Sequence, residues 1–113
     1  GSLPATSAEK LTDLLEQKLD SEVKVIGNGE VKTVGLVTGG AADIVRQAIE
    51  EGLDCYITGE GANHHFHEAT EGNCILIFAG HYATETGGVK SIGKHLQEKF
   101  GIVSEFLHYP TGL

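Results

Sequence analysis

Apolar residues along the chain alternate between helical spacing and short continuous runs. Four leucines at helical intervals predict an amphipathic helix over residues 8–19, with Ser7 as its N-cap. Helical spacing returns over residues 41–51 and, after a histidine-rich segment at 63–69, over residues 81–100. The apolar runs predict strands at residues 22–26, 31–37, 54–58, 74–79 and 102–108.

This alternation predicts an α/β fold, with a mixed or mostly parallel sheet covered by helices on both faces. Parallel strands deliver the loops that follow them to one edge of the sheet, where open α/β sheets bind ligands. The length of 113 residues fits one domain. We assign the domain to residues 3–113, with Leu3–Thr6 as a leader, because Gly1-Ser2 is typical of the remnant of a cleaved tag. The chain contains no methionine, which indicates a piece of a longer protein.

Composition narrows the classes of partner. Eight basic against sixteen acidic residues give a formal charge of −8, which argues against a nucleic-acid backbone as the main partner. No apolar run approaches the length of a membrane span and no signal peptide is visible, so no membrane association is expected. Cys55 and Cys74 both fall in predicted strands, which favours buried free thiols and a cytoplasmic location.

The clearest candidate chemistry follows the apolar run Cys74–Ala79, in the segment Gly80-His81-Tyr82-Ala83-Thr84-Glu85. Gly80 allows a sharp turn where the strand ends, which places His81 at its carboxyl end and Glu85 one helical turn later on the same face. An imidazole and a carboxylate placed this way can bind one metal ion. The alternative is a histidine at a helix start beside a solvated glutamate.

Two other segments leave two interpretations each. Thr38-Gly39-Gly40 could cradle a phosphate on its backbone N–H groups or form a simple tight turn. His64 and His67 would share one face of a helix, where they could bind zinc or iron. Alternatively, these histidines are solvated or hydrogen-bonded to the backbone.

Four segments, taken in order, resemble one protein family. They are Asp54-x-Tyr56-Ile57-Thr58-Gly59-Glu60, His64-x-x-His67-Glu68-Ala69, Gly80-His81-Tyr82-x-Thr84-Glu85 and the closing Pro110-Thr111-Gly112. In this order the chain resembles the Nif-three-like family, whose members are often called GTP cyclohydrolase 1 type 2 homologues.

The resemblance implies one lobe of a longer α/β protein with a duplicated two-lobe fold, which holds a pair of metal ions and assembles into a toroidal hexamer. It implies that the carboxy-terminal lobe supplies a histidine and a glutamate as metal ligands, here His81 and Glu85. Residues expected to line the cleft, as further ligands or substrate contacts, are Thr58, Glu60, His64 and His67. The amino-terminal lobe is absent, so the fragment is expected to bind zinc, iron or manganese weakly or not at all.

Two classes of function fit this pattern. A two-metal site polarises a substrate oxygen and lowers the pKa of bound water, which predicts a metal-dependent hydrolase of a nucleotide or phosphate-containing small molecule when the protein is full-length. The isolated fragment is expected to be inactive. The alternative is a non-catalytic metal-binding module or ring scaffold. A lobe separated from its partner also exposes apolar surface, which predicts self-association.

Overall fold

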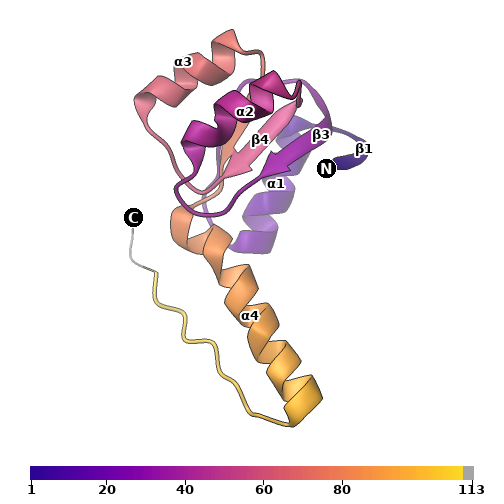
Figure 1. The fold of residues 1–113 in the computed structure, drawn as a ribbon, viewed down its shortest axis with the longest axis vertical. Helices are drawn as coiled ribbons and strands as arrows, with labels where there is room; N and C mark the ends of the chain where they lie inside the picture. Colours follow the sequence, from indigo (N-terminus) through magenta and orange to yellow (C-terminus); the bar gives the residue numbers. More distant parts are fainter. Residues whose placement is uncertain (111–113) are drawn as a thin grey trace.

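A computed structural model describes residues 1–110 and shows a five-stranded mixed sheet with helices on both faces (Figure 1). The strands lie in the order β1-β3-β4-β5-β2. Along the chain the elements are β1 Ser2–Ser7, α1 Ala8–Leu19, β2 Lys24–Ile26, β3 Glu30–Leu36, the 3₁₀ turn η1 Ala42–Ile44, α2 Val45–Glu50, β4 Cys55–Thr58, α3 Asn63–Glu71, β5 Ile75–Phe78 and α4 His81–Phe100.

The three central strands are parallel, and both edge strands are antiparallel to their neighbours. β3 pairs with β4 and β4 with β5 in parallel, while β1 and β2 pair antiparallel with β3 and β5. The predicted mixed sheet is therefore confirmed. Because the central strands are parallel, the loops that follow them leave from one edge of the sheet.

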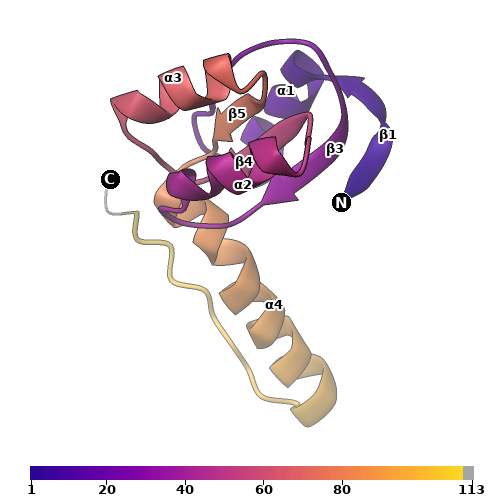
Figure 2. The same cartoon turned by 45° about the horizontal axis from the view of Figure 1, so that its top comes forward.

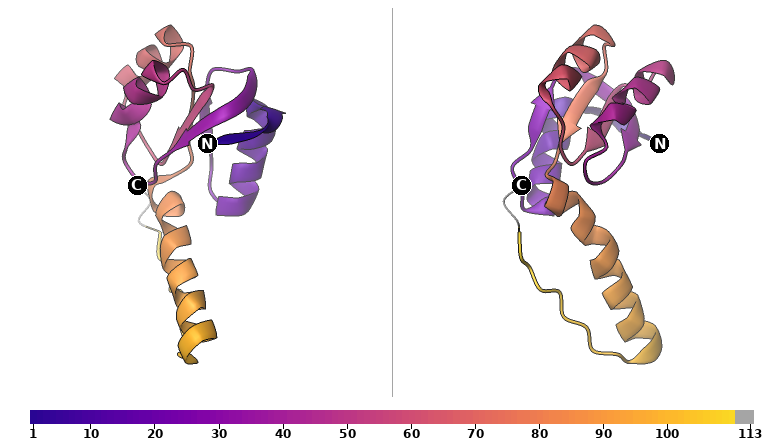
Figure 3. Two further views of the ribbon diagram at one scale, coloured as in Figure 1. Left: turned by 45° about the vertical axis from the view of Figure 1, so that its right-hand side comes forward. Right: turned by 60° about the vertical axis from the view of Figure 1, so that its left-hand side comes forward.

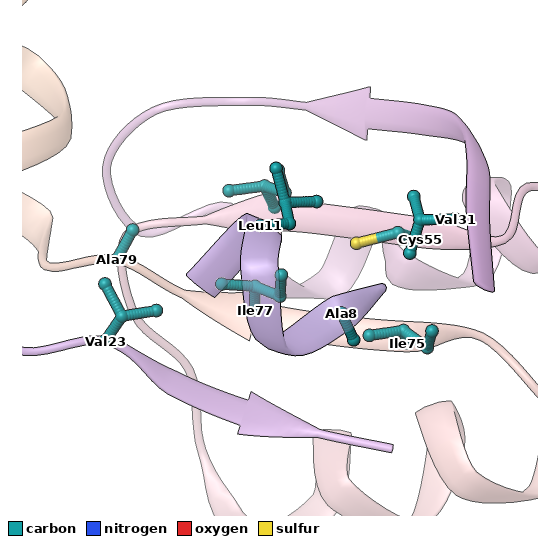
Figure 4. Packing of buried hydrophobic residues seen from close by; sticks show 9 residues of the cluster. Ala8, Leu11, Val23, Val31, Cys55, Ile75, Ile77 and Ala79 are labelled. Carbon is teal, nitrogen blue, oxygen red and sulfur yellow. The ribbon is translucent and has the colours of Figure 1, made fainter. Parts of the chain in front are cut away.

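Each face of the sheet has its own core. Figure 4 shows α1 lying over the first face, with side chains of the helix against alternate residues of β4 and β5, including Cys55, Ile75 and Ile77. On the second face α2 and α3 pack side by side (Figure 2) over the intervening residues of the same strands, Tyr56 and Leu76. This alternation follows from the period of two in a strand buried on both sides.

Two local predictions are confirmed, namely Ser7 as the N-cap of α1 and Cys55 and Cys74 as buried free thiols. Ser7 caps α1, since its hydroxyl accepts a hydrogen bond from the N–H of Lys10 at 3.2 Å. Gly52 and Gly101 follow their helices with φ of +66°, the left-handed conformation that ends a helix. Cys55 and Cys74 are free and buried. No helix within residues 1–110 combines the length and apolarity needed to cross a bilayer.

The start of the chain forms a strand that the sequence pattern did not predict. Residues expected to be a tag remnant and a leader form the edge strand β1, which pairs Thr6 with Val31. The amino group of Gly1 donates to the carbonyl of Val34 at 2.7 Å. The exposed outer edge of β3 explains this pairing, because unpaired backbone groups of a strand bind any extended segment that reaches them.

The predicted last strand, residues 102–108, is wrong. This segment contains no regular secondary structure, because α4 carries the chain away from the sheet and the returning segment finds no strand edge (Figure 3). It runs back beside α4, where the hydroxyl of Tyr82 accepts a hydrogen bond from the N–H of Tyr109 at 2.9 Å. Of the closing Pro110-Thr111-Gly112 segment, residues 111 and 112 lie outside the described residues.

Candidate metal centre

Three loops meet at the carboxyl edge of the parallel strands. They are residues 38–40 after β3, Gly59–Gly61 after β4, and Gly80 before α4. Backbone hydrogen bonds join them: the N–H of Gly59 donates to the carbonyl of Gly39 at 2.8 Å, and the N–H of Gly80 donates to the carbonyl of Gly59 at 2.9 Å. These bonds hold the three loops against one another.

Two buried or half-buried threonines fix the first loop. Thr58 is fully buried, and its hydroxyl donates to the carbonyl of Gly39 at 3.0 Å and accepts from the N–H of Ala41 at 3.3 Å. The hydroxyl of Thr84 accepts from the N–H of Gly39 at 3.0 Å. Two N–H groups that a phosphate would need are thus already bonded. The structure favours the tight turn over the phosphate cradle.

His81 lies between two carboxylates. Its Nδ1 is 2.8 Å from Oε1 of Glu60, and its Nε2 is 3.6 Å from Oε1 of Glu85 on the next turn of α4. The hydrogen bond with Glu60 is the main cause that raises the pKa of His81; the charges of Glu60 and Glu85 add to it, and desolvation opposes it. All three side chains are partly exposed.

The geometry beside Gly39 fits a metal ion. A Cβ on Gly39 would lie 2.7 Å from Oε1 of Glu85 and 3.3 Å from Nε2 of His81, so only glycine leaves this space open. Two atoms that each bind one ion at about 2.0–2.2 Å must lie within about 4.4 Å of each other, and the 3.6 Å between Nε2 of His81 and Oε1 of Glu85 meets that condition. The pair could supply two protein ligands and would leave the remaining positions of an ion to water or to other ligands.

A second cluster lies between η1 and α3. Ligand atoms of Asp43, His64 and His65 are within 4.8 Å of one another, so these residues form a potential metal-binding cluster. However, the ring of His65 already bonds through both nitrogens. Its Nδ1 accepts from the N–H of Ala62 at 2.8 Å, which leaves the proton on Nε2, 2.9 Å from Oδ1 of Asp43.

This bonding makes His65 a structural residue. A metal on its Nε2 would need to displace both the proton and the contact with Asp43. The side chain of His65 is only 6% exposed, and its hydrogen bond is the main cause that lowers the pKa of Asp43. Asp43 and His64 are exposed, and their ligand atoms are 3.7 Å apart. They could bind an ion only as a pair unless α3 rearranges.

The sequence located some of these residues and missed others. His81 and Glu85 lie together as their spacing indicated, and Glu60, expected in the cleft, contacts His81. His64 contacts Asp43, while His67 lies exposed on α3 beside Phe66. The missed residues are Gly39, Asp43, His65 and Thr84. Gly39 and Thr84 each carried a sequence signal, the glycine pair after a buried strand and the Gly80–Glu85 segment, whereas nothing in the sequence distinguished Asp43 or His65.

Comparisons with known proteins agree on one family. The family model of Duf34/NIF3 (NGG1p interacting factor 3) matches residues 1–109. A protein of Halobacterium salinarum named GTP cyclohydrolase 1 type 2 homolog is 41% identical over 119 residues, covering 100% of this chain and 47% of that protein. A protein of the same name from Deinococcus radiodurans is 38% identical over 100 residues, covering 86% of this chain and 38% of that protein.

Solved structures show the same fold. TTHA1606 from Thermus thermophilus superimposes with a TM-score of 0.87 at 36% identity, covering 99% of this chain and 46% of that one. The protein ybgI, described as of unknown function, superimposes with a TM-score of 0.88 at 28% identity, covering 96% and 45%. The chain thus spans less than half the length of these relatives, which is consistent with one lobe of a two-lobe fold.

Proposed function

The chain belongs to the Duf34/NIF3 family, and from this we propose that it is the carboxy-terminal lobe of a metal-binding protein and contributes His81 and Glu85 to a dinuclear site. The observation that supports the proposal is the pair of ligand atoms, 3.6 Å apart, that faces the bare backbone of Gly39. The remaining ligands would come from the part of the protein that this chain does not span.

The reaction we propose is hydrolysis of a nucleotide or another phosphate-containing small molecule. A divalent ion such as zinc, iron or manganese supplies Lewis acidity and a nucleophilic water near neutral pH. His81 and Glu85 would hold the ion at the sheet edge, and Glu60 would hold the ring of His81. An open hollow beside them, lined by residues that include Glu22, Lys24 and Phe78, leaves room for a substrate.

A non-catalytic role is the second candidate. At the two candidate metal sites within residues 1–110, the bonded side-chain pairs are His81 with Glu60 and His65 with Asp43. Neither pair joins a hydroxyl or thiol nucleophile to a base. A protein that stores or delivers metal, or a ring scaffold, needs no such pair. Phosphate or formate release from nucleotides by the full-length, metal-loaded protein distinguishes the hydrolase from the scaffold.

We further propose that the protein self-associates in the cytoplasm. Apolar residues stand exposed on α4 and on the segment that follows it, among them Ile92, Val103 and Leu107. Such a surface favours association. The hexameric ring belongs to the longer protein, and the isolated lobe, with two ligands, would bind metal weakly and lack activity.

Titration of this chain with zinc or manganese tests the metal assignment. We expect weak binding, measured by calorimetry, that His81→Ala or Glu85→Gln reduces at least about 10-fold, since even residues behind the ligands commonly contribute that much. His95→Ala, which removes an exposed histidine farther along α4, is the matched control and should change nothing.

His64→Ala separates the two candidate centres. If the ion binds at His81 and Glu85, this substitution leaves the titration unchanged. If His64→Ala abolishes binding and His81→Ala does not, the ion belongs to the Asp43, His64 and His65 cluster and the assignment is refuted. The same variants in the full-length protein should lower metal content without unfolding it.

A further inference from the structure

Glu60 lies on the loop after β4, and the backbone of this loop packs closely against neighbouring residues. Glu60 stands between Gly59 and Gly61, and neither glycine can carry a side chain. A Cβ on Gly59 would lie 2.7 Å from the Cα of His81, and a Cβ on Gly61 would lie 2.5 Å from the ring of Phe78. Both distances are shorter than real Cβ contacts. The loop is therefore pressed onto the end of β5 and the start of α4.

The close approach brings the carboxylate of Glu60 to one particular nitrogen of His81. Oε1 of Glu60 is 2.8 Å from Nδ1, whereas Oε1 of Glu85 faces Nε2 on the opposite side of the ring. A carboxylate only accepts hydrogen bonds, so the bond at 2.8 Å requires the proton on Nδ1. The ring of neutral His81 then presents the lone pair of Nε2 toward Glu85 and Gly39.

We propose that Glu60 is a positioning residue that fixes the Nδ1–H tautomer and the orientation of His81, so that Nε2 faces the ion that Glu85 also binds. A hydrogen bond at one imidazole nitrogen determines which nitrogen remains for a metal. The inference rests on the proposed metal function, which it deepens by assigning a role to a residue that does not itself bind the ion.

The tautomer can be measured without metal or activity. Nitrogen-15 NMR separates a protonated ring nitrogen from an unprotonated one, and at about pH 9, well above the ordinary histidine pKa of about 6.5, a neutral ring shows its tautomer directly. In the unaltered chain we expect His81 to carry its proton on Nδ1. In Glu60→Ala we expect a mixture of tautomers, and a zinc affinity reduced about 10- to 100-fold.

Two further variants control for folding and charge. Glu60→Gln keeps an oxygen that can accept from Nδ1–H, so it should retain the tautomer and lose less affinity than Glu60→Ala. Glu71→Ala removes an equal charge from the exposed end of α3, outside this hollow, and should alter neither measurement. Backbone NMR spectra show whether each variant is folded, and Glu60→Gln keeps the test decisive if Glu60→Ala does not fold.

The outcomes separate this inference from the proposed function. An Nδ1–H tautomer that survives in Glu60→Ala, or an unchanged zinc affinity in that variant, overturns the positioning role even if His81 binds metal. If instead Glu60→Ala loses the Nδ1–H tautomer while His81→Ala leaves the zinc titration unchanged, the metal function is refuted. The conclusion that Glu60 fixes the tautomer of His81 is then still supported.

Discussion

Asp54 joins the start of β4 to β3 through a single carboxylate oxygen. Its Oδ2 accepts hydrogen bonds from the N–H of Lys32 at 2.9 Å and from the N–H and hydroxyl of Thr33 at 2.8 and 2.9 Å. The backbone bond from Lys32 is the main cause that lowers the pKa of Asp54, and the bonds from Thr33 add to it. The ionised carboxylate is thus favoured by the folded state.

This bonding makes stability depend on pH in a defined direction. Because the pKa of Asp54 is lower in the folded chain than in the unfolded chain, where it is about 3.9, the ionised carboxylate stabilises the fold above about pH 3.9. This stabilisation is lost as the pH falls through the pKa of Asp54 in the folded chain. Asp54→Asn should therefore lower the urea midpoint at about pH 7, and the difference from the unaltered chain should shrink below about pH 4. A difference that stays constant across this range would contradict the assignment.

Asp13→Asn is the matched control for this measurement. Asp13 lies exposed on α1, so the same chemical change there should leave the urea midpoint nearly unaltered at every pH.

At the residue scale, sequence predicts pairs that are close along the chain and misses those joined by the fold. His81 and Glu85 share one helical face, so their spacing alone indicated a pair. The partners of the Asp54 carboxylate are 21 or 22 positions away in β3, and the carboxylate partner of His65 is 22 positions away in η1. Nothing in the local pattern of residues 41–45 distinguishes Asp43 from a solvated acid, because its role depends on how α3 lies over η1.

At the scale of elements, two glycines inside the helix α4 lower its stability. Gly87 and Gly88 lie inside it, and a Cβ at either position would meet no atom within 4 Å. The close packing that these glycines could have indicated is therefore absent. Glycine inside a helix costs about 1 kcal/mol relative to alanine.

Gly87→Ala and Gly88→Ala should each stabilise α4 by roughly 0.5–1 kcal/mol. Hydrogen exchange is the appropriate measurement, because α4 projects from the domain (Figure 1) and a helix with few buried residues can open without global unfolding. Its amides should exchange about 2- to 5-fold more slowly in each variant. Gly101→Ala is the control: its φ of +66° strains any other residue, so that variant should gain nothing. Unchanged exchange in the first two variants would contradict the prediction.

The elements show where pattern analysis succeeds and fails. From residue 8 to residue 100 the helices and strands follow the predicted order, because apolar periodicity marks them even in α4, where most of the apolar side chains are exposed. The two failures lie at the ends of the chain. β1 has a weak apolar pattern and exists because an edge of β3 accepts it, whereas residues 102–108 have a strong apolar pattern and no edge to join.

At the scale of the whole molecule, α4 and the segment after it give the chain an elongated shape. The radius of gyration is 15.4 Å, whereas a compact chain of this length has about 13 Å. Large apolar side chains on this projection are more than half exposed, namely Val89, Ile92, Phe100, Ile102, Val103, Leu107 and Tyr109. We name these residues the α4–tail surface.

A second copy of the chain should cover the α4–tail surface in solution. We expect light scattering to show a dimer or larger assembly, and Ile92→Glu to shift it toward the monomer, because burying a carboxylate without a partner is costly. Ile44→Glu places the same change on η1, outside this surface, and should leave the assembly intact. A monomer at high concentration in the unaltered chain would refute the prediction.

The two cysteines lie on opposite faces of the sheet, and this gives the molecule two internal reporters of its own opening. The thiol of Cys55 belongs to the core under α1, and burial raises its pKa to about 12. The thiol of Cys74 belongs to the core under α2 and α3. A thiol-reactive dye reacts only with an exposed thiolate. The labelling rate of each cysteine therefore reports how often the helices that cover it separate from the sheet. Labelling of Cys55→Ser and Cys74→Ser variants would show whether the two layers separate from the sheet together or one at a time.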